Sequence, residues 1–181
     1  MRAGITSILL AAILASIPCL PASAVSNETA ITITMNTTAV IEIELSVTNW
    51  TIGDVEPNKE YVTDPPIEWC TLTNKGNYEV NTFIKGENAT SAGDTSYKWT
   101  LNDAGTNGED IYALWFRVSG DTARMYVPIT KTKGELWPWD GGGSSLAPNA
   151  TKQFGLRLLT PTFFYGDKQM QTHIIVSAVA A

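Results

Sequence analysis

Apolar and polar residues alternate along residues 31–47 without a break in phase. Most even positions carry Thr or Glu, whereas the odd positions are mainly apolar. The odd positions hold Ile31, Ile33, Met35, Thr37, Ala39, Ile41, Ile43, Leu45 and Val47. Because successive side chains of a strand point to opposite faces, this pattern predicts extended structure with one apolar face. The stretch is longer than the roughly 3–10 residues of an ordinary strand.

This N-terminal alternation has two interpretations. In the first, the stretch forms a long bent strand, or two strands, within the chain's own domain. In the second, residues 25–36 leave the domain and complete the sheet of a neighbouring copy, where backbone hydrogen bonds give affinity and alternate side chains give register. The whole assembly strand is placed at residues 25–45, with residues 25–36 leaving the domain, and its apolar face consists of Ile31, Ile33, Met35, Ile41, Ile43 and Leu45. Head-to-tail repetition of such a contact builds an open filament.

The rest of the chain has short alternating runs separated by turn-rich stretches. The predicted strands are 67–74, 78–85, 97–101, 111–119, 124–130, 153–160 and 169–179, and the turns are 64–66, 74–77, 86–94, 102–110 and 140–148. Residues 25–181 contain 43 Ile, Val and Thr and 17 aromatic residues, which favour strands. We therefore expect an all-β fold, an antiparallel β-sandwich of jelly-roll or immunoglobulin-like type. The sandwich domain is expected at 49–181, after an N-terminal strand segment at 25–48.

Residues 1–24 have the form of a secretory signal peptide. Arg2 precedes an uncharged apolar run over residues 5–17, and residues 22–24 (ASA) form a small-residue cleavage site. The run is shorter than the roughly 20 residues that span a bilayer. We expect a protein that is secreted, extracellular or on the cell surface, with no transmembrane segment after cleavage.

The charge balance and the scarcity of His and Cys limit the candidate chemistry. The net charge is −6 and no basic run is present, so a nucleic-acid partner is not expected. His173 is the only histidine, which argues against His-rich metal sites and His-dependent catalysis. After signal cleavage Cys70 is the only cysteine, so no internal disulfide can form, and we expect a buried, inert thiol. These features favour a non-enzymatic protein without a cofactor.

Several short motifs carry a resemblance to a known group of proteins. They are residues 49–55 (NWTIGDV), 71–77 (TLTNKGN), 99–101 (WTL), 110–114 (DIYAL), 146–151 (LAPNAT), 154–158 (FGLRL) and the closing strand at 174–178. Over residues 27–179 the chain resembles the TasA/camelysin-type secreted β-sandwich proteins and the archaeal bundling-pilus subunits. The resemblance implies a jelly-roll-like sandwich that polymerises through an N-terminal donor strand. The name camelysin implies a protease, but this chain has no HExxH motif, so no catalytic residue is carried over.

Five Asn-X-Thr sequons are candidate N-glycosylation sites. They begin at Asn27, Asn36, Asn49, Asn88 and Asn149. All five fall in predicted loops or at strand ends, where a glycan can be accommodated. The alternative is that a Thr-rich chain contains sequons by chance.

Two further stretches suggest ligands. Asp103, Asn107 and Asp110 lie in an acidic turn that partly fits a calcium loop, but Gly105 and Leu114 stand where an EF-hand needs oxygen ligands, so a solvated turn is favoured over calcium. Residues 137–143 (WPWDGGG) join two indoles to a flexible loop, which suits glycan stacking by Trp137 and Trp139. The alternative is that both indoles cap the sandwich or lie at a subunit contact.

The sequence therefore favours a secreted structural subunit of an extracellular filament or matrix, which polymerises with itself by donor-strand addition. The alternative is a secreted monomeric module that binds carbohydrates or other cell-surface components.

Overall fold

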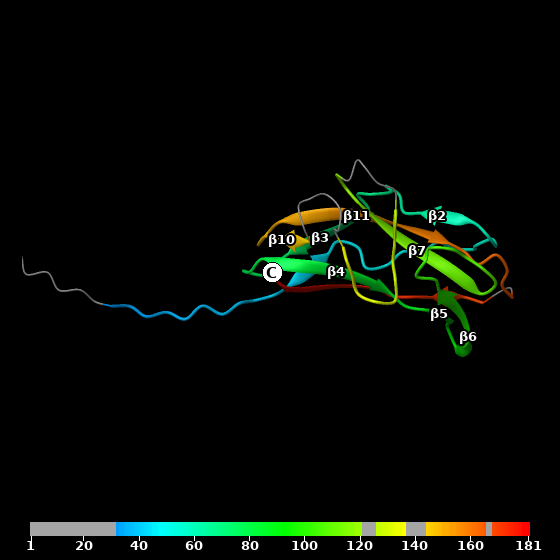
Figure 1. Ribbon diagram of the computed structural model, residues 1–181, viewed down its shortest axis with the longest axis horizontal. Helices are drawn as coiled ribbons and strands as arrows, with labels where there is room; N and C mark the ends of the chain where they lie inside the picture. Colours follow the sequence, from blue (N-terminus) through cyan, green and yellow to red (C-terminus); the bar gives the residue numbers. More distant parts are fainter. Residues whose placement is uncertain (1–31, 121–125, 137–143, 166–167) are drawn as a thin grey trace, which may run out of the picture. The chain divides into compact units, whose positions relative to one another are not determined.

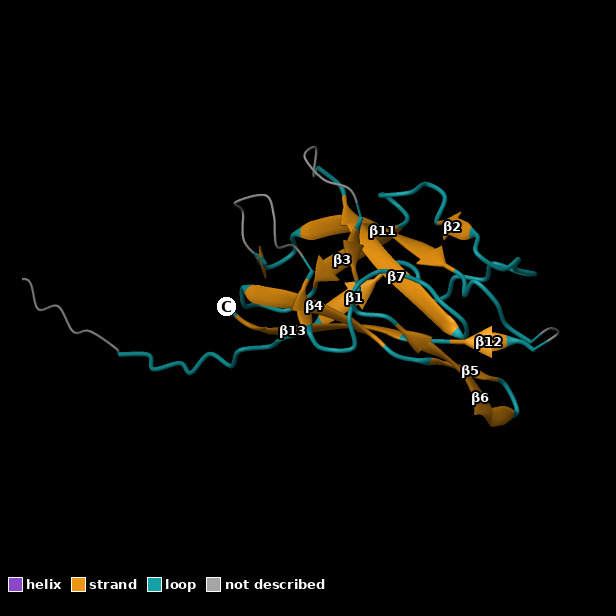
Figure 2. Cartoon of the chain, turned by 45° about the vertical axis from the view of Figure 1, so that its right-hand side comes forward, coloured by secondary structure: helices purple, strands orange, loops and turns teal. Residues whose placement is uncertain are grey.

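The computed structural model describes residues 32–120, 126–136, 144–165 and 168–181 (Figure 1). The chain divides into two units, residues 1–36 and residues 37–181. In the first unit, the described residues 32–36 belong to no strand. In the second, the described residues form strands, turns and loops without a helix (Figure 2). The prediction of an all-β fold is confirmed.

The larger sheet has nine strands, in the order β1-β3-β11-β7-β6-β5-β12, with β2 paired to β11 and β8 to β7. Its strands are β1 (Ile43–Leu45), β2 (Glu60–Val62), β3 (Cys70–Asn74), β5 (Ala89–Ser91), β6 (Asp94–Leu101), β7 (Ile111–Val118), β8 (Val127–Pro128), β11 (Thr151–Leu159) and β12 (Met170–Gln171). β7 and β11 form its longest pair, from Phe154 opposite Val118 to Leu159 opposite Ala113. Both were predicted from their alternation.

The smaller sheet has four strands built around β4 (Val80–Gly86). On one side β4 pairs along its whole length with β13 (Ile174–Ala180). On the other side it pairs with two short strands, β9 (Gly134–Glu135) and β10 (Ser145–Leu146). The four strands of the smaller sheet therefore come from separate parts of the sequence, and local sequence patterns do not reveal their pairing.

The apolar faces of the two sheets share one hydrophobic cluster. In β4 every second residue is buried, as the period of a strand requires. Leu114 and Phe116 of β7 and Phe154 and Leu156 of β11 belong to this cluster. In the last strand, Ile174, Val176 and Ala178 share one face and also pack against the cluster.

One strand pair contradicts the expectation of purely antiparallel sheets. β6 and β7 run parallel, with Thr100 opposite Ile111 and Leu101 opposite Tyr112. Parallel neighbours ordinarily need a long crossover connection. Here only the last two residues of β6 pair with the first two of β7. The connection over residues 102–110 therefore only has to bring Ile111 beside Thr100.

Three other local predictions were wrong in part. Residues 86–94, predicted as a turn, contain β5, and residues 140–148 contain β10. The single strand predicted at 169–179 is split into β12 and β13, with Thr172 and His173 between them. At the break the Thr172 hydroxyl donates to the backbone oxygen of Glu87 at 3.0 Å, a bond that regular pairing does not supply.

The predicted long strand over residues 31–47 is not formed within its described part. Residues 32–42 belong to no strand, and β1 covers only Ile43–Leu45. The phase of the alternation is nevertheless confirmed where pairing occurs, because Ile43, Leu45 and Val47 all pack against the hydrophobic cluster. Just before β1 the chain bonds to a turn instead of a strand, which ends the ladder there.

Candidate functional site

The predicted assembly strand is divided by its environment. Ile33 and Met35 have exposed fractions of 74% and 81%, and Ile41 is exposed to 46%. Ile43 and Leu45, by contrast, are partly buried against the cluster. Ile31 lies outside the described residues. One continuous alternation therefore begins with strongly exposed apolar side chains and ends with side chains that pack, partly buried, against the hydrophobic cluster.

Residues 38–42 are held by the turn at residues 74–77. The amide nitrogens of Lys75 and Gly76 donate to the backbone oxygen of Glu42, at 2.9 and 3.2 Å. The Asn77 side chain accepts from the Val40 amide at 2.7 Å and donates to the Thr38 oxygen at 3.0 Å. The Asn77 amide also donates to the Val40 oxygen at 3.1 Å. We call residues 38–42 together with turn 74–77 the N-terminal clamp.

Gly76 allows this close approach of two backbones. A Cβ added to Gly76 would lie 2.2 Å from the Val40 oxygen, far inside van der Waals contact. The φ angle of Gly76 is not positive, so the reason for glycine is space and not backbone conformation. Any larger residue would push residues 38–42 off the turn.

The turn is itself fixed to the core by the fully buried Asn74. Its Nδ2 donates to the backbone oxygens of Tyr78 and Leu146, each at 2.8 Å, and its Oδ1 accepts from the Gly76 amide at 3.0 Å. A buried amide is stabilised when its donors and acceptor are satisfied in this way. Sequence analysis identified residues 74–77 as a turn, but it gave no sign of the segment that the turn would hold.

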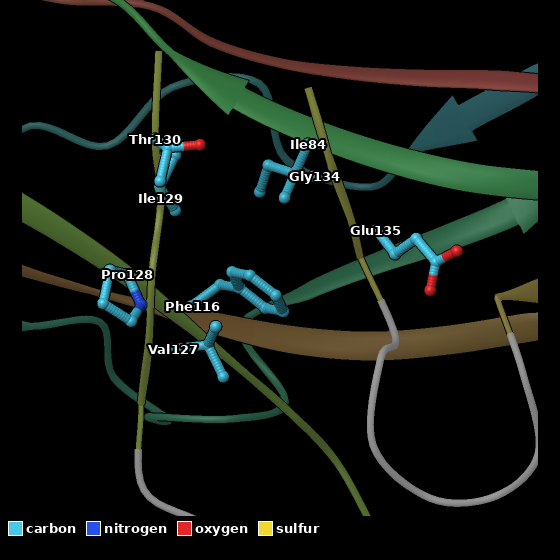
Figure 3. Close-up of a pocket in the computed structure, with 8 residues that line it drawn as sticks. All are labelled: Ile84, Phe116, Val127, Pro128, Ile129, Thr130, Gly134 and Glu135. Atoms are coloured by element: carbon cyan, nitrogen blue, oxygen red, sulfur yellow. The ribbon is translucent and has the colours of Figure 1, made fainter. Parts of the chain in front are cut away.

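An apolar cavity of about 340 Å³ lies between β8 and β9 (Figure 3). Its lining residues are Ile84, Phe116, Val127, Pro128, Ile129, Thr130, Gly134 and Glu135. The close-up shows Ile84 and Phe116 between the two chain segments that carry β8 and β9. Among the described strands, β8 pairs only with β7 and β9 only with β4, so each has one edge without a strand partner.

A second unpartnered edge belongs to β13. Within the described chain this strand pairs only with β4. Its outer side chains Ile175 and Val179 are exposed to 37% and 41%. Unpaired strand edges are templates for pairing with another chain, so a further strand can be added at β13 or beside β8 and β9. Among the described strands, β1, β2, β10 and β12 also pair on one side only.

The three residues of the predicted calcium loop turn to different neighbours. Oδ1 of Asp103 accepts from the Lys131 amide at 2.8 Å. Asn107 donates to Oδ1 of Asn58 and to the Thr160 oxygen, at 2.9 and 2.7 Å. Oδ1 of Asp110 accepts from the Tyr97 hydroxyl at 3.3 Å. Each side chain therefore hydrogen-bonds to a different part of the chain. The described residues contain no cluster of metal-binding side chains.

Four of the five sequons lie in the described part, and all four Asn residues are exposed. Asn49 lies in a loop, where its Nδ2 donates to the Thr51 hydroxyl at 3.2 Å. Asn149 lies in the turn before β11 with a positive φ of 62°. Asn88 differs, because its Oδ1 accepts from the Leu101 amide at 3.0 Å and its sequon continues into β5. Asn36 is outside any strand, and Asn27 lies outside the described residues.

The remaining candidates are Trp137, Trp139, Cys70 and His173. Trp137 and Trp139 lie outside the described residues. Cys70 is buried, as expected for an inert thiol. The His173 side chain is 80% exposed and lies 3.6 Å from a carboxylate oxygen of Glu87. The part of the chain that the structure describes has no helix long and apolar enough to cross a membrane.

Sequence analysis missed a cation–aromatic cluster on the larger sheet. The Arg157 guanidinium lies 4.1 Å from the centroid of the Trp115 ring and 4.9 Å from that of Tyr126. Its Nη1 is 3.5 Å from a carboxylate oxygen of Glu60. Burial raises the pKa of Tyr126, whose hydroxyl donates to the Pro66 oxygen at 3.2 Å. The cluster joins the loop after β2 to the sheet and is best explained by packing.

Comparison with protein-family models, with curated proteins and with solved structures finds no match for this chain. The function proposed below is therefore inferred from the residues and geometry of the chain itself.

Proposed function

We propose that this protein is a secreted, non-enzymatic subunit of an extracellular filament or matrix, which polymerises by donor-strand addition. One observation carries the proposal: Ile33 and Met35 are strongly exposed, yet they share their phase with Ile43 and Leu45, which pack partly buried against the hydrophobic cluster. Exposed apolar side chains in strand alternation are suited to a sheet that another copy supplies. The motifs that resemble TasA/camelysin-type proteins and bundling-pilus subunits support the same function.

The finer features of the fold belong to the same proposal. We interpret the two sheets with their shared apolar cluster as a β-sandwich of jelly-roll type. Residues 1–24 would direct secretion and be removed, which leaves residues 25–36 as the donor segment. The mechanism is association and not turnover, so it requires no cofactor, and the partner is a second copy of the chain.

The cavity between β8 and β9 is the acceptor that best suits such a strand. A strand added there would pair with the edges of β8 and β9 that no described strand occupies, and it would place its apolar side chains against Ile84 and Phe116. Residues two apart on one face of a strand are roughly 7 Å apart, so neighbouring apolar positions of the donor can enter one elongated site.

The decisive experiment compares the two faces of the donor segment in the full chain. Ile33→Asp with Met35→Asp places charges on the apolar face, whereas Thr32→Asp with Thr34→Asp adds the same charges to the polar face. The proteins are examined by negative-stain microscopy and size-exclusion chromatography. We expect regular fibres from the wild type and the polar-face variant, and monomers from the apolar-face variant.

Removal of residues 25–35 is a second test and should also leave a soluble monomer. Fibres formed by the apolar-face variant or by the truncated protein would disprove donor-strand addition. A wild type that stays monomeric at all concentrations would instead favour the surface-binding module.

A further inference from the structure

We propose that Asn77 is a positioning residue for assembly, because its side chain fixes the point at which the donor segment separates from the domain. This inference rests on the proposed function and adds the device that sets the boundary of the donor strand. Its basis is the N-terminal clamp, which lies wholly within residues 37–181.

The side chain and the backbone amide of Asn77 together satisfy three backbone polar groups of Thr38 and Val40. Oδ1 accepts from the Val40 amide, the Asn77 amide donates to the Val40 oxygen, and Nδ2 donates to the Thr38 oxygen. Asn combines an acceptor and a donor on one short side chain, and the N-terminal clamp uses both. Ala at the same position could make neither side-chain bond.

The clamp determines which backbone groups are available to another copy. The amide and oxygen of Val40 and the oxygens of Thr38 and Glu42 already have partners within the domain. Pairing of these residues with a neighbouring sheet would require those bonds to break. The donor strand therefore ends before Thr38, and the spacing between successive subunits is set by a fixed length of chain.

The role of Asn77 is separable from the stability of the fold. Asn77 is exposed, whereas the turn is anchored by the buried Asn74. The backbone bonds from Lys75 and Gly76 to Glu42 do not involve the Asn77 side chain. Removal of that side chain should loosen residues 38–40 and leave the sheets intact.

The test compares Asn77→Ala with Asn107→Ala in the full chain. Asn107 is a matched control, because its side chain also donates two hydrogen bonds that join separate loops, and neither partner belongs to the clamp. We expect amide hydrogen exchange at Val40 to accelerate at least tenfold in Asn77→Ala and to stay unchanged in Asn107→Ala. Fibres of Asn77→Ala should become irregular in their subunit repeat or fall several-fold in yield, while those of Asn107→Ala remain normal.

A conservative variant gives a graded result. Asn77→Asp keeps the acceptor for the Val40 amide and loses the Nδ2 donor to Thr38. Exchange at Val40 should then stay slow, and fibre regularity should lie between that of the wild type and Asn77→Ala. A merely structural role would instead change the melting temperature and fibre yield in parallel.

Failure of this inference can be told apart from failure of the proposed function. If fibres require Ile33 and Met35 but Asn77→Ala fibres are as regular as the wild type, the positioning role is wrong and donor-strand addition stands. If the wild type forms no fibres, or the apolar-face variant forms them, both are overturned.

Discussion

The backbone of Gly155 passes directly beneath the carbonyl group of Pro66. A Cβ added to Gly155 would lie 1.5 Å from the Pro66 oxygen and 2.9 Å from Oγ1 of Thr63. The loop is fastened at this point, because the Thr63 amide donates to the Leu156 oxygen at 3.1 Å and the Leu156 amide donates to the Thr63 hydroxyl at 3.0 Å. Glycine at this strand position thus allows the loop after β2 to lie on the sheet.

Gly155→Ala should therefore destabilise the protein, because a methyl group there must displace backbone atoms. Overpacked sites of this kind cost about 1–3 kcal/mol, and a backbone collision places this one at the upper end. Urea unfolding of the purified protein measures the difference. Gly134→Ala is the matched control, since an added Cβ there meets nothing nearer than the Ile84 oxygen at 4.0 Å. Equal midpoints for the two variants would contradict the close approach.

Tyr112 should make stability depend on alkaline pH. Burial is the main reason that its pKa is raised, the nearby Glu87 charge raises it further, and a hydrogen bond with Thr172 acts in the opposite direction. The folded state thus favours the neutral phenol. The contribution of Tyr112 to the free energy of unfolding is complete below the unfolded pKa of about 10. It is lost as the pH rises above that value, because the tyrosine of the unfolded chain then ionises first.

The variant Tyr112→Phe isolates this effect. At pH 7 it should be less stable than the wild type by about 1 kcal/mol, because the hydroxyl's bonds to Thr172 and to the Glu87 backbone oxygen are lost. Between pH 10 and 11 the difference should shrink or reverse. Tyr126, whose pKa is also raised, is present in both proteins and cancels. A difference in urea midpoint that stays constant from pH 7 to pH 11 would contradict this account.

The strands that sequence reasoning located are those long enough to show alternation. β7 and β11 each place a clear apolar face on the cluster, and both were predicted. β8 lies within a longer predicted strand, at 124–130, but the two-residue strands β9 and β10 were not predicted, because a period of two cannot be read from so few positions. Their pairing depends on β4, which is distant in sequence.

The candidate site was only partly predictable for a related reason. Alternation around Ile33 and Ile43 is the same whether a residue pairs, packs or stays exposed, so it does not show where the domain begins. Residues 74–77 were recognisable as a turn from Asn and Gly. The contact between Asn77 and Val40 spans 37 positions, and only the folded chain reveals it.

The sequons should differ in occupancy when the protein is produced in a host that glycosylates secreted chains. Asn49 lies in an exposed loop, whereas the sequon of Asn88 enters β5, where Thr90 lies between Lys98 of β6 and Gln171 of β12. Glycan transfer favours surface loops, so we expect higher occupancy at Asn49. Peptide mass spectrometry before and after enzymatic deglycosylation measures both sites. Equal occupancy would show that modification precedes formation of β5.

The acceptor cavity can be located by cross-linking between copies. Met35→Cys with Glu135→Cys places one thiol on the donor's apolar face and one at the rim of the cavity. If the donor enters between β8 and β9, oxidation of assembled fibres should give a ladder of covalent multimers on non-reducing gels. Met35→Cys with Lys98→Cys is the control, because the exposed Lys98 lies on β6 and does not line the cavity. Native Cys70 is buried and should not contribute.

A third cysteine pair tests the alternative edge. A ladder from Met35→Cys with Val179→Cys, and none from the Glu135 pair, would move the acceptor to β13, where Val179 is exposed on the outer face. Disulfides need Cα atoms within roughly 7 Å, so an efficient ladder reports true proximity and not chance collision. Ladders from all three pairs, the control included, would mean that the donor segment is not held in any one groove. The alternation of its side chains argues against that outcome.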